Sequence, residues 1–218
     1  RPDDPLAVAL GGALLVPEEA TNTSFGFTTS PIDNLSLTFD MYTIDIVNKI
    51  IKSRSLPVEN NPEFKKLAFY TNALDTETSG FDLVLTYRMG DTNLGLAMNH
   101  NETKMVEHRK IGPDQLDPIS TGLIDNIENN LPKDRIIATV TQNFGDALSL
   151  MVRLNNYSET LDERGTLGDD KSTVDAISFI DVELSYSVSN NLNVVFGANN
   201  VTNAYPNEID TRASQGMP

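Results

Sequence analysis

The sequence is dominated by a period of two in its apolar residues. From residue 35 onward, Leu35, Leu37 and Phe39 alternate with polar side chains, and residues 148–155 and 180–188 repeat the pattern. Successive side chains of a β-strand leave opposite faces of the sheet, so this alternation predicts strands with one apolar and one polar face. An amphipathic helix would instead place apolar residues three and four positions apart.

Two kinds of connection separate the predicted strands. Short segments rich in Gly, Pro, Asp and Asn are typical of hairpin turns. Long polar segments lie between them, at residues 47–66, 104–133, 158–173 and 201–218. Because short and long connections alternate, an up-and-down sheet places all tight turns at one end and all long loops at the other. Transmembrane β-barrels have this arrangement, and strands of about ten residues cross a bilayer at a tilt.

The sequence therefore predicts an all-β fold. We expect an antiparallel up-and-down (meander) sheet of about eight strands, forming a segment of a transmembrane β-barrel, with one short loop helix. The predicted strands are residues 20–29, 35–46, 75–88, 93–103, 134–144, 147–157, 175–188 and 192–200. The helix is expected within residues 115–131, where Leu123, Ile124, Ile127 and Leu131 have helical spacing and Ser120 or Thr121 is the N-cap.

Composition excludes several classes of function. The chain has 31 acidic and 16 basic residues, so its net charge of −15 argues against a nucleic-acid partner. It has no Cys, which removes disulfides and thiolate sites, and its two histidines, His100 and His108, lack a catalytic or metal-binding pattern. No nucleotide, metal or nucleophile motif occurs. We expect no enzyme activity, no catalytic or metal residue and no cofactor.

Charged residues on the polar side of the strands are the candidate functional residues. In a barrel this side faces the lumen, where charges are hydrated or paired with a plug. We interpret them as lumen wall and plug contacts, with direct ligand contact as the alternative. They are Asp40, Asp82, Arg88, Arg153, Asp181 and Glu183.

The last strand resembles a known family. Residues 192–208, LNVVFGANNVTNAYPNE, are similar to the penultimate strand of TonB-dependent outer-membrane receptors, in which Gly197, Asn200 and Pro206 match the conserved spacing of the motif. The usual acidic residue is replaced by Thr202 and Asn203. Similar segments precede it in the family's order, at residues 13–27, 34–50, 70–87 and 131–159.

The resemblance implies that residues 1–218 are the C-terminal part of a receptor barrel, without the plug domain and the closing strand. It implies an active importer of a scarce large ligand, such as a siderophore-iron complex, cobalamin or an oligosaccharide, in the bacterial outer membrane. The implied partners are outer-membrane lipid, the ligand, and TonB and the plug through the full-length receptor. The residues of the loops that contact the ligand are unknown from sequence.

A second interpretation stays open. Eight strands can close into a small barrel of their own, so the chain could be a self-contained barrel or a soluble β-domain that binds a ligand or partner. The charged residues of the polar side would fill a narrow dry interior poorly.

Overall fold

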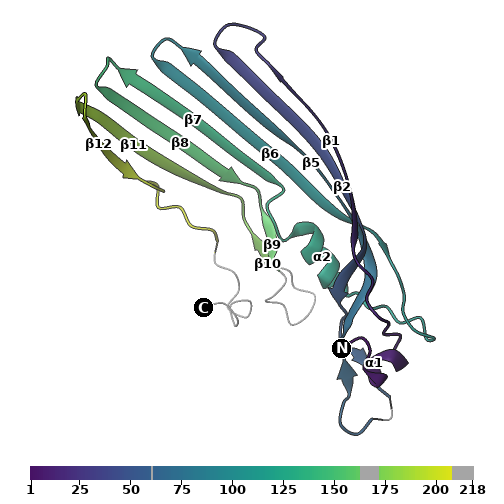
Figure 1. Ribbon diagram of the computed structural model, residues 1–218. Coiled ribbons are helices and arrows are strands. Elements are labelled where there is room, and N and C mark those ends of the chain that lie inside the picture. The colour runs from purple at the N-terminus through teal and green to yellow at the C-terminus, as the bar shows by residue number, and fades with distance from the viewer. Residues whose placement is uncertain (60, 163–171, 208–218) are drawn as a thin grey trace. The chain divides into compact units, whose positions relative to one another are not determined.

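The computed structural model describes residues 1–59, 61–162 and 172–207. Eight strands form one sheet in the order β1-β2-β5-β6-β7-β8-β11-β12 (Figure 1). They are β1 (Glu19–Thr29), β2 (Leu35–Lys52), β5 (Tyr70–Met89), β6 (Thr92–His108), β7 (Asp134–Phe144), β8 (Leu148–Tyr157), β11 (Ile177–Ser189) and β12 (Leu192–Ala198). The order follows the sequence without a crossover, which confirms the predicted antiparallel meander.

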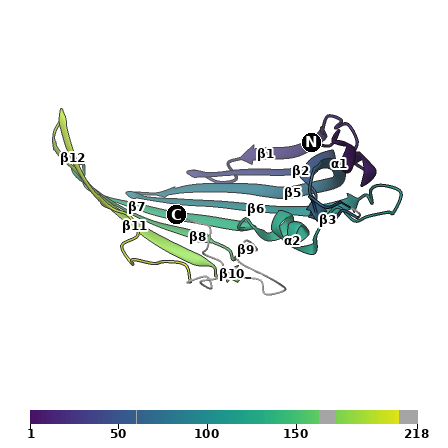
Figure 2. The same cartoon turned by 90° about the horizontal axis from the view of Figure 1, so that it is seen from below.

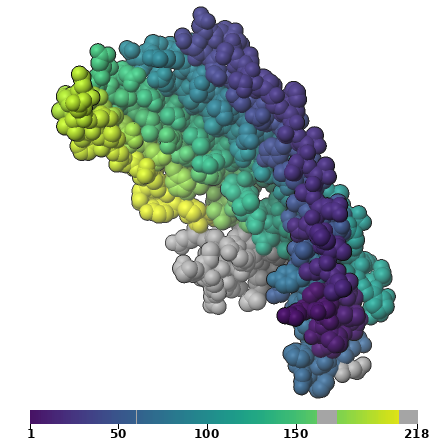
Figure 3. Space-filling view, in the orientation of Figure 1, coloured from purple at the N-terminus to yellow at the C-terminus, as the bar shows by residue number. Residues whose placement is uncertain are grey.

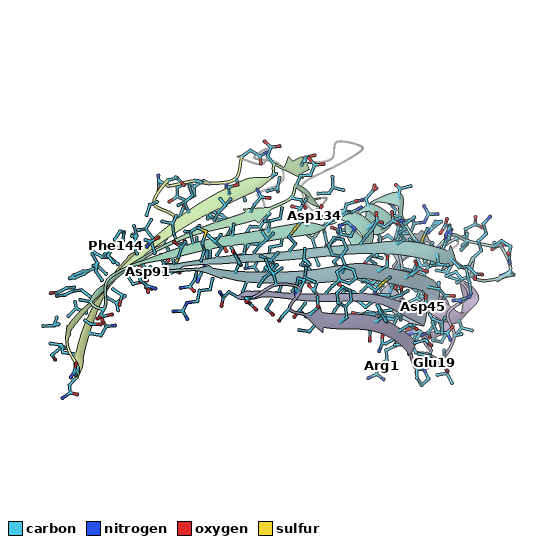
Figure 4. The ribbon with its side chains drawn as sticks, turned by 90° about the horizontal axis from the view of Figure 1, so that it is seen from above. Arg1, Glu19, Asp45, Asp91, Asp134 and Phe144 are labelled. Atoms are coloured by element: carbon cyan, nitrogen blue, oxygen red, sulfur yellow. The ribbon has the colours of Figure 1, made fainter. Side chains whose placement is uncertain are left out.

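Tight turns join β1 to β2, β5 to β6, β7 to β8 and β11 to β12 at the same end of the sheet (Figure 1). Gly90 and Gly145 adopt φ angles of +59° and +64°, which glycine reaches without the steric penalty of a Cβ. Figure 4 shows Asp91 and Phe144 at this turn end of the strands and Asp134 at the opposite end.

Contacts divide the chain into two compact units. Unit 1 comprises Arg1–Thr23, Thr43–Ser79 and Glu102–Asn129. Unit 2 comprises Ser24–Tyr42, Gly80–Asn101 and Asn130–Pro218.

Unit 2 is a single layer of sheet. Figure 2 shows β7, β8 and β11 side by side in one layer, and on the face seen in Figure 3 the strands of this unit reach the surface. None of the described residues of unit 2 is buried. A sheet normally hides its apolar side against a second layer, so both sides of unit 2 lack the cover that a soluble domain supplies.

Strand register sorts the side chains of unit 2 into two faces. Across β6, β7, β8, β11 and β12, one row joins Leu94, Val140, Val152, Val182 and Ala198. The rows beside it hold Leu96, Ala138, Leu154 and Ile180, and Gln142, Leu150, Leu184 and Phe196. These residues define the apolar face, and the residues between them in sequence define the polar face.

Unit 1 holds all the buried residues of the described chain. It contains α1 (Pro5–Ala9), the hairpin β3 (Leu56–Pro57) with β4 (Lys66–Leu67), and α2 (Thr121–Asn129). One hydrophobic cluster joins α1, the hairpin, Ala73 and Ile111, and a second joins Ile51, Leu74, Ile119 and α2. Ala73 and Leu74 are successive residues of β5, so the two clusters lie on opposite sides of that strand.

Helix α2 confirms the predicted loop helix. Ser120 Oγ accepts a hydrogen bond from the Leu123 N–H at 3.1 Å, which is the N-cap contact expected for this position. Leu123, Ile124 and Ile127 pack on the second cluster. Leu131 does not join them, because the helix ends at Asn129 and the Leu131 side chain is exposed.

Several predicted boundaries were wrong. Strands β2, β5 and β6 run beyond the alternating residues, so residues 47–52 and 104–108 are strand and not loop. In β5 alternation is lost at residues 73–76, because this stretch is covered on both sides in unit 1 and a strand buried on both faces does not alternate. The hairpin β3–β4, the hairpin of β9 (Thr160–Asp162) with β10 (Ser172–Val174), and helix α1 were not predicted. The parts of the predicted loops at residues 163–171 and 208–218 lie outside the described residues.

Candidate functional site

The six charged candidates share the polar face of the sheet. Register places Arg153 opposite Asp181, and Glu183 follows two residues later on the same side. Asp82 Oδ1 accepts a hydrogen bond from Asn99 Nδ2 at 2.9 Å, and Asn99 lies opposite Arg135 on this face. Alternation along β5 and β2 adds Arg88 and Asp40 to the same side.

Two of the six are held by neighbouring side chains. Besides the Asp82–Asn99 pair, Asp181 accepts hydrogen bonds from Asn155 Nδ2 at 3.0 Å and from the Asn200 N–H at 2.9 Å. A carboxylate that accepts such bonds fixes the groups that donate them. Asp181 is therefore a structural contact within the sheet as well as a charge on the polar face.

The other four side chains make no hydrogen bond or ion pair with the described residues. They are Asp40, Arg88, Arg153 and Glu183, and all four are exposed. Arg153 lies directly opposite Asp181 in the register, yet the carboxylate of Asp181 is engaged by the two asparagines. These four charges are available to groups outside this segment of sheet.

Asn200 folds the segment after β12 into a compact turn. Its φ is +50°, its Oδ1 accepts from the Ala204 N–H at 2.9 Å, and its Nδ2 donates to the Ala204 carbonyl at 2.9 Å. Asparagine tolerates the left-handed region and closes such turns with its own side chain. The motif residue singled out from the sequence thus builds a turn, and Asp181 anchors it.

A cation and two aromatic rings lie together on the polar face, at the end opposite the tight turns. The Arg135 guanidinium carbon lies 5.0 Å from the centroid of the Tyr157 ring, and the Tyr157 and Phe179 rings meet edge to face at 6.2 Å. Sequence reasoning missed this group. Each residue alternates correctly in its own strand, but only the register brings the three strands together.

The apolar face carries an aromatic row across four strands. Phe27, Phe39, Phe81 and His100 follow one another with ring centroids 5.6 to 6.0 Å apart. His100 Nδ1 lies 2.7 Å from Asp134 Oδ1. His108 Nε2 lies 3.4 Å from Asp117 Oδ2 in unit 1. Each histidine thus lies beside a carboxylate from a distant part of the chain, which no sequence pattern indicated.

Unit 1 is fixed by a polar network between its segments. Arg109 pairs with the buried Asp75 and donates from Nη1 to the Asn72 carbonyl at 3.0 Å, while Asp75 Oδ1 accepts from the Asn48 N–H at 2.9 Å. Asn72 also binds both backbone polar groups of Val16, which ties the N-terminal segment to β5. The connections of this unit are consequently packed and hydrogen-bonded parts of a small core.

Acidic side chains surround Lys104 of unit 1. Its Nζ lies 2.8 Å from Glu102 Oε2, and this hydrogen bond and charge raise the pKa of Lys104, with smaller contributions from Glu77 and Glu128. Across residues 1–59, 61–162 and 172–207, no group of three or more His, Asp or Glu side chains could hold a metal ion. No helix in the described part is long and apolar enough to cross a membrane.

Comparison with known proteins identifies the family. Residues 3–201 match the family model described as "TonB dependent receptor-like, beta-barrel". No curated protein matches the sequence.

Solved structures share the fold. The chain is similar to the FrpB iron transporter from Neisseria meningitidis, with a TM-score of 0.63 and 17% identity over 87% of this chain and 28% of that one. A mutant of the ferric enterobactin receptor PfeA from Pseudomonas aeruginosa has a TM-score of 0.62 and 14% identity, over 86% of this chain and 26% of that one. The siderophore receptor PirA from Acinetobacter baumannii has a TM-score of 0.60 and 16% identity, over 86% of this chain and 28% of that one.

The chain spans about a quarter of the length of these three proteins. Its open meander, with tight turns at one end and long connections between the hairpins, corresponds to a segment of their barrels. With the family match covering residues 3–201, the chain belongs to the TonB-dependent receptors, and its strands form part of their β-barrel.

Proposed function

We propose that unit 2 is a segment of an outer-membrane barrel wall whose apolar face contacts lipid and whose polar face lines the lumen. This proposal is supported by the register of β6, β7, β8, β11 and β12, which sorts consecutive residues into apolar and polar rows. Strands of membrane barrels alternate in this way between lipid and lumen. Asp40, Asp82, Arg88, Arg153, Asp181 and Glu183 then face the lumen.

The dimensions of the apolar face suit a bilayer. Strand β7 runs from Asp134 to Phe144, and both ends of it belong to this face. Ten steps of about 3.3 Å, tilted by about 40°, span about 25 Å along the membrane normal, the height of the apolar band of such barrels. Phe144 and Tyr186 supply aromatic side chains at the turn end of this face, and such residues suit the membrane interface.

We propose that the full-length protein is an active importer in the bacterial outer membrane and not an enzyme. The family match supports TonB as the energy-coupling partner and a plug domain elsewhere in the protein. Siderophore-iron is favoured over cobalamin and oligosaccharide, because three of the similar structures are named as an iron transporter, a ferric enterobactin receptor and a siderophore receptor, although another is named as a copper transporter. The Arg135 guanidinium, which lies over the Tyr157 ring, offers a positive charge suited to an anionic ligand.

The alternative of a self-contained small barrel or soluble β-domain is less well supported. In the described sheet β1 and β12 are the two edges, and neither pairs with the other. A free-standing domain requires a buried core, and none of the described residues of unit 2 is buried.

An uptake assay tests the function. The full-length receptor would be produced in a Gram-negative strain without its own siderophore receptors, with and without TonB. Radio-iron-labelled ferric enterobactin and vitamin B12 are suitable probes. We expect radio-iron to accumulate only when both the receptor and TonB are present. Equal accumulation without TonB, or none of either probe with receptor in the outer membrane, would contradict the proposal.

A further inference from the structure

Residues 1–12 of unit 1 form a small cap on the first hydrophobic cluster. The cap contains α1 and the turn after it, and it packs the fully buried Ala7 and the partly buried Leu10 against the cluster. The other buried residues of this cluster come from the rest of unit 1, and they are Leu56, Phe69, Ala73 and Ile111. The cap therefore helps to keep apolar side chains of unit 1 away from water.

The hydrogen bonds of the cap stay inside the cap. The Leu6 N–H donates to Oδ1 of the N-cap residue Asp4 at 2.9 Å, and the Gly12 N–H donates to the Ala7 carbonyl at 2.7 Å. Within the described chain, residues 1–12 form no hydrogen bond or ion pair with any residue outside the cap. Lifting the cap thus breaks no hydrogen bond, and its cost is the loss of apolar contact at Ala7 and Leu10.

The cap is seated by a crossing of two backbone segments. Gly11 and Gly112 both have positive φ angles, of +98° and +72°. A Cβ at Gly11 would lie 2.2 Å from the backbone nitrogen of Gly112, and a Cβ at Gly112 would lie 2.7 Å from the Leu10 carbonyl oxygen. Glycine allows both the backbone conformation and the close approach, so a side chain at position 112 would push the cap from its seat.

The segment after the cap is anchored by side chains. The backbone N–H of Val16 donates to Asn72 Oδ1 at 2.9 Å, and its carbonyl accepts from Asn72 Nδ2 at 3.0 Å. Glu18 Oε1 accepts from the Ile50 N–H at 2.6 Å. Between the cap and this anchor, residues 13–15 are exposed and form no hydrogen bond with the described residues. They are placed to act as a hinge.

We infer that the cap is a lid, which turns about residues 13–15 and uncovers the first hydrophobic cluster while Val16 and Glu18 hold the segment that follows. Local opening occurs where few apolar contacts are buried, and Ala7 is the one fully buried side chain of the cap. In the open state the apolar side chains of Leu56 and Ile111 become accessible. The motion involves unit 1 alone, and it does not depend on which face of unit 2 contacts lipid.

Cysteine labelling of the full-length receptor in outer membranes tests the lid. The chain has no Cys, so one introduced thiol can report on one position in a receptor without other cysteines. Ala7→Cys should react with a maleimide about tenfold faster than Thr76→Cys, because opening of the lid exposes position 7 whereas position 76 needs wider unfolding.

Thr76 is a matched position for this comparison. It is 2% exposed, and its hydroxyl has no hydrogen-bond partner in the described chain, so Thr76→Cys removes none. Alternation along β5 places it on the side of Leu74, which belongs to the second cluster and not to the one that the cap covers. Equal reaction rates at positions 7 and 76 would show that the cap is a fixed part of the core, and the inference would be wrong.

A second comparison tests the seat of the lid. Gly112→Ala should raise the labelling rate of Ala7→Cys about tenfold and leave that of Thr76→Cys unchanged, because it favours a local opening. Gly145→Ala is the control, since Gly145 has a φ of +64° and a Cβ there would meet nothing within 4 Å. It should change neither rate. No effect of Gly112→Ala at position 7, or an equal rise at both positions, would contradict a lid that opens by itself.

Discussion

The backbone N–H of Asn200 donates a hydrogen bond of 2.9 Å to Oδ1 of Asp181, which lies nineteen positions earlier in the neighbouring strand. The second oxygen of the same carboxylate accepts from Asn155 on the strand beyond. One side chain on the polar face thus joins β8, β11 and the turn that follows β12. This relationship gives Asp181 a role that the other acidic residues of its face do not share.

The first prediction separates a structural carboxylate from a free one. Asp181→Ala should lower the free energy of unfolding in detergent by about 1–3 kcal/mol, because it leaves the Asn200 N–H and the Asn155 amide without an acceptor. Glu183→Ala is the matched control on the same strand and face, and it should change stability by less than about 0.5 kcal/mol. Urea unfolding of the full-length receptor measures both. Equal losses of stability in the two variants would show that Asp181 has no special structural role.

The second prediction tests the assignment of the two faces. Val152 and Met151 are neighbours in β8, with Val152 on the apolar face and Met151 opposite Glu183 on the polar face. Val152→Arg should destabilise the folded receptor in lipid by about 2–4 kcal/mol if this position lies near the bilayer midplane. Met151→Arg should be tolerated, since the lumen is wet and Glu183 lies opposite. The reverse order in a lipid-folding titration would show that the faces are exchanged.

The third prediction concerns a glycine beneath an aromatic ring. A Cβ at Gly80 would lie 2.3 Å from the His100 carbonyl oxygen and 2.6 Å from the Tyr42 hydroxyl oxygen. Because a backbone carbonyl cannot move aside cheaply, Gly80→Ala should cost about 1–3 kcal/mol of unfolding free energy. Gly197→Ala serves as the control, since its Cβ would meet only the Val182 carbonyl oxygen, at 3.8 Å. Thermal unfolding in detergent compares the pair, and similar melting temperatures would show that the contact is relieved without cost.

The fourth prediction tests whether unit 1 has its own core. Leu74 is fully buried in the cluster that holds α2, whereas Val106 is 64% exposed. Leu74→Ala should destabilise the packing of α2 by about 2–5 kcal/mol, while Val106→Ala should have little effect. Hydrogen exchange of residues 121–129 is the measurement, with the amides of β7 and β8 as the internal reference. Unchanged exchange in α2 would mean that the helix does not depend on this cluster.

Local periodicity was sufficient to predict the strands of unit 2 and their two faces. Between Leu148 and Leu154, the residues that face the apolar side alternate with residues that face the other side of the sheet. This pattern can be recognised in one strand without knowing which strand pairs with it. The same reasoning placed all six charged candidates on one face of the sheet. Helix α2 was also predictable, because its N-cap Ser120 and its apolar spacing lie within one short segment.

What the sequence by itself determined about this protein is therefore its class of fold, the direction of each strand's side chains and its resemblance to a receptor barrel. The tertiary structure decided which side chains meet: Asp181 with Asn200, Arg135 with Tyr157, and Asp75 with Arg109. It also decided that β5 is covered on both sides at Ala73 and Leu74. The physical reason is that alternation is a property of one strand, whereas register and loop packing depend on contacts between residues far apart in the chain.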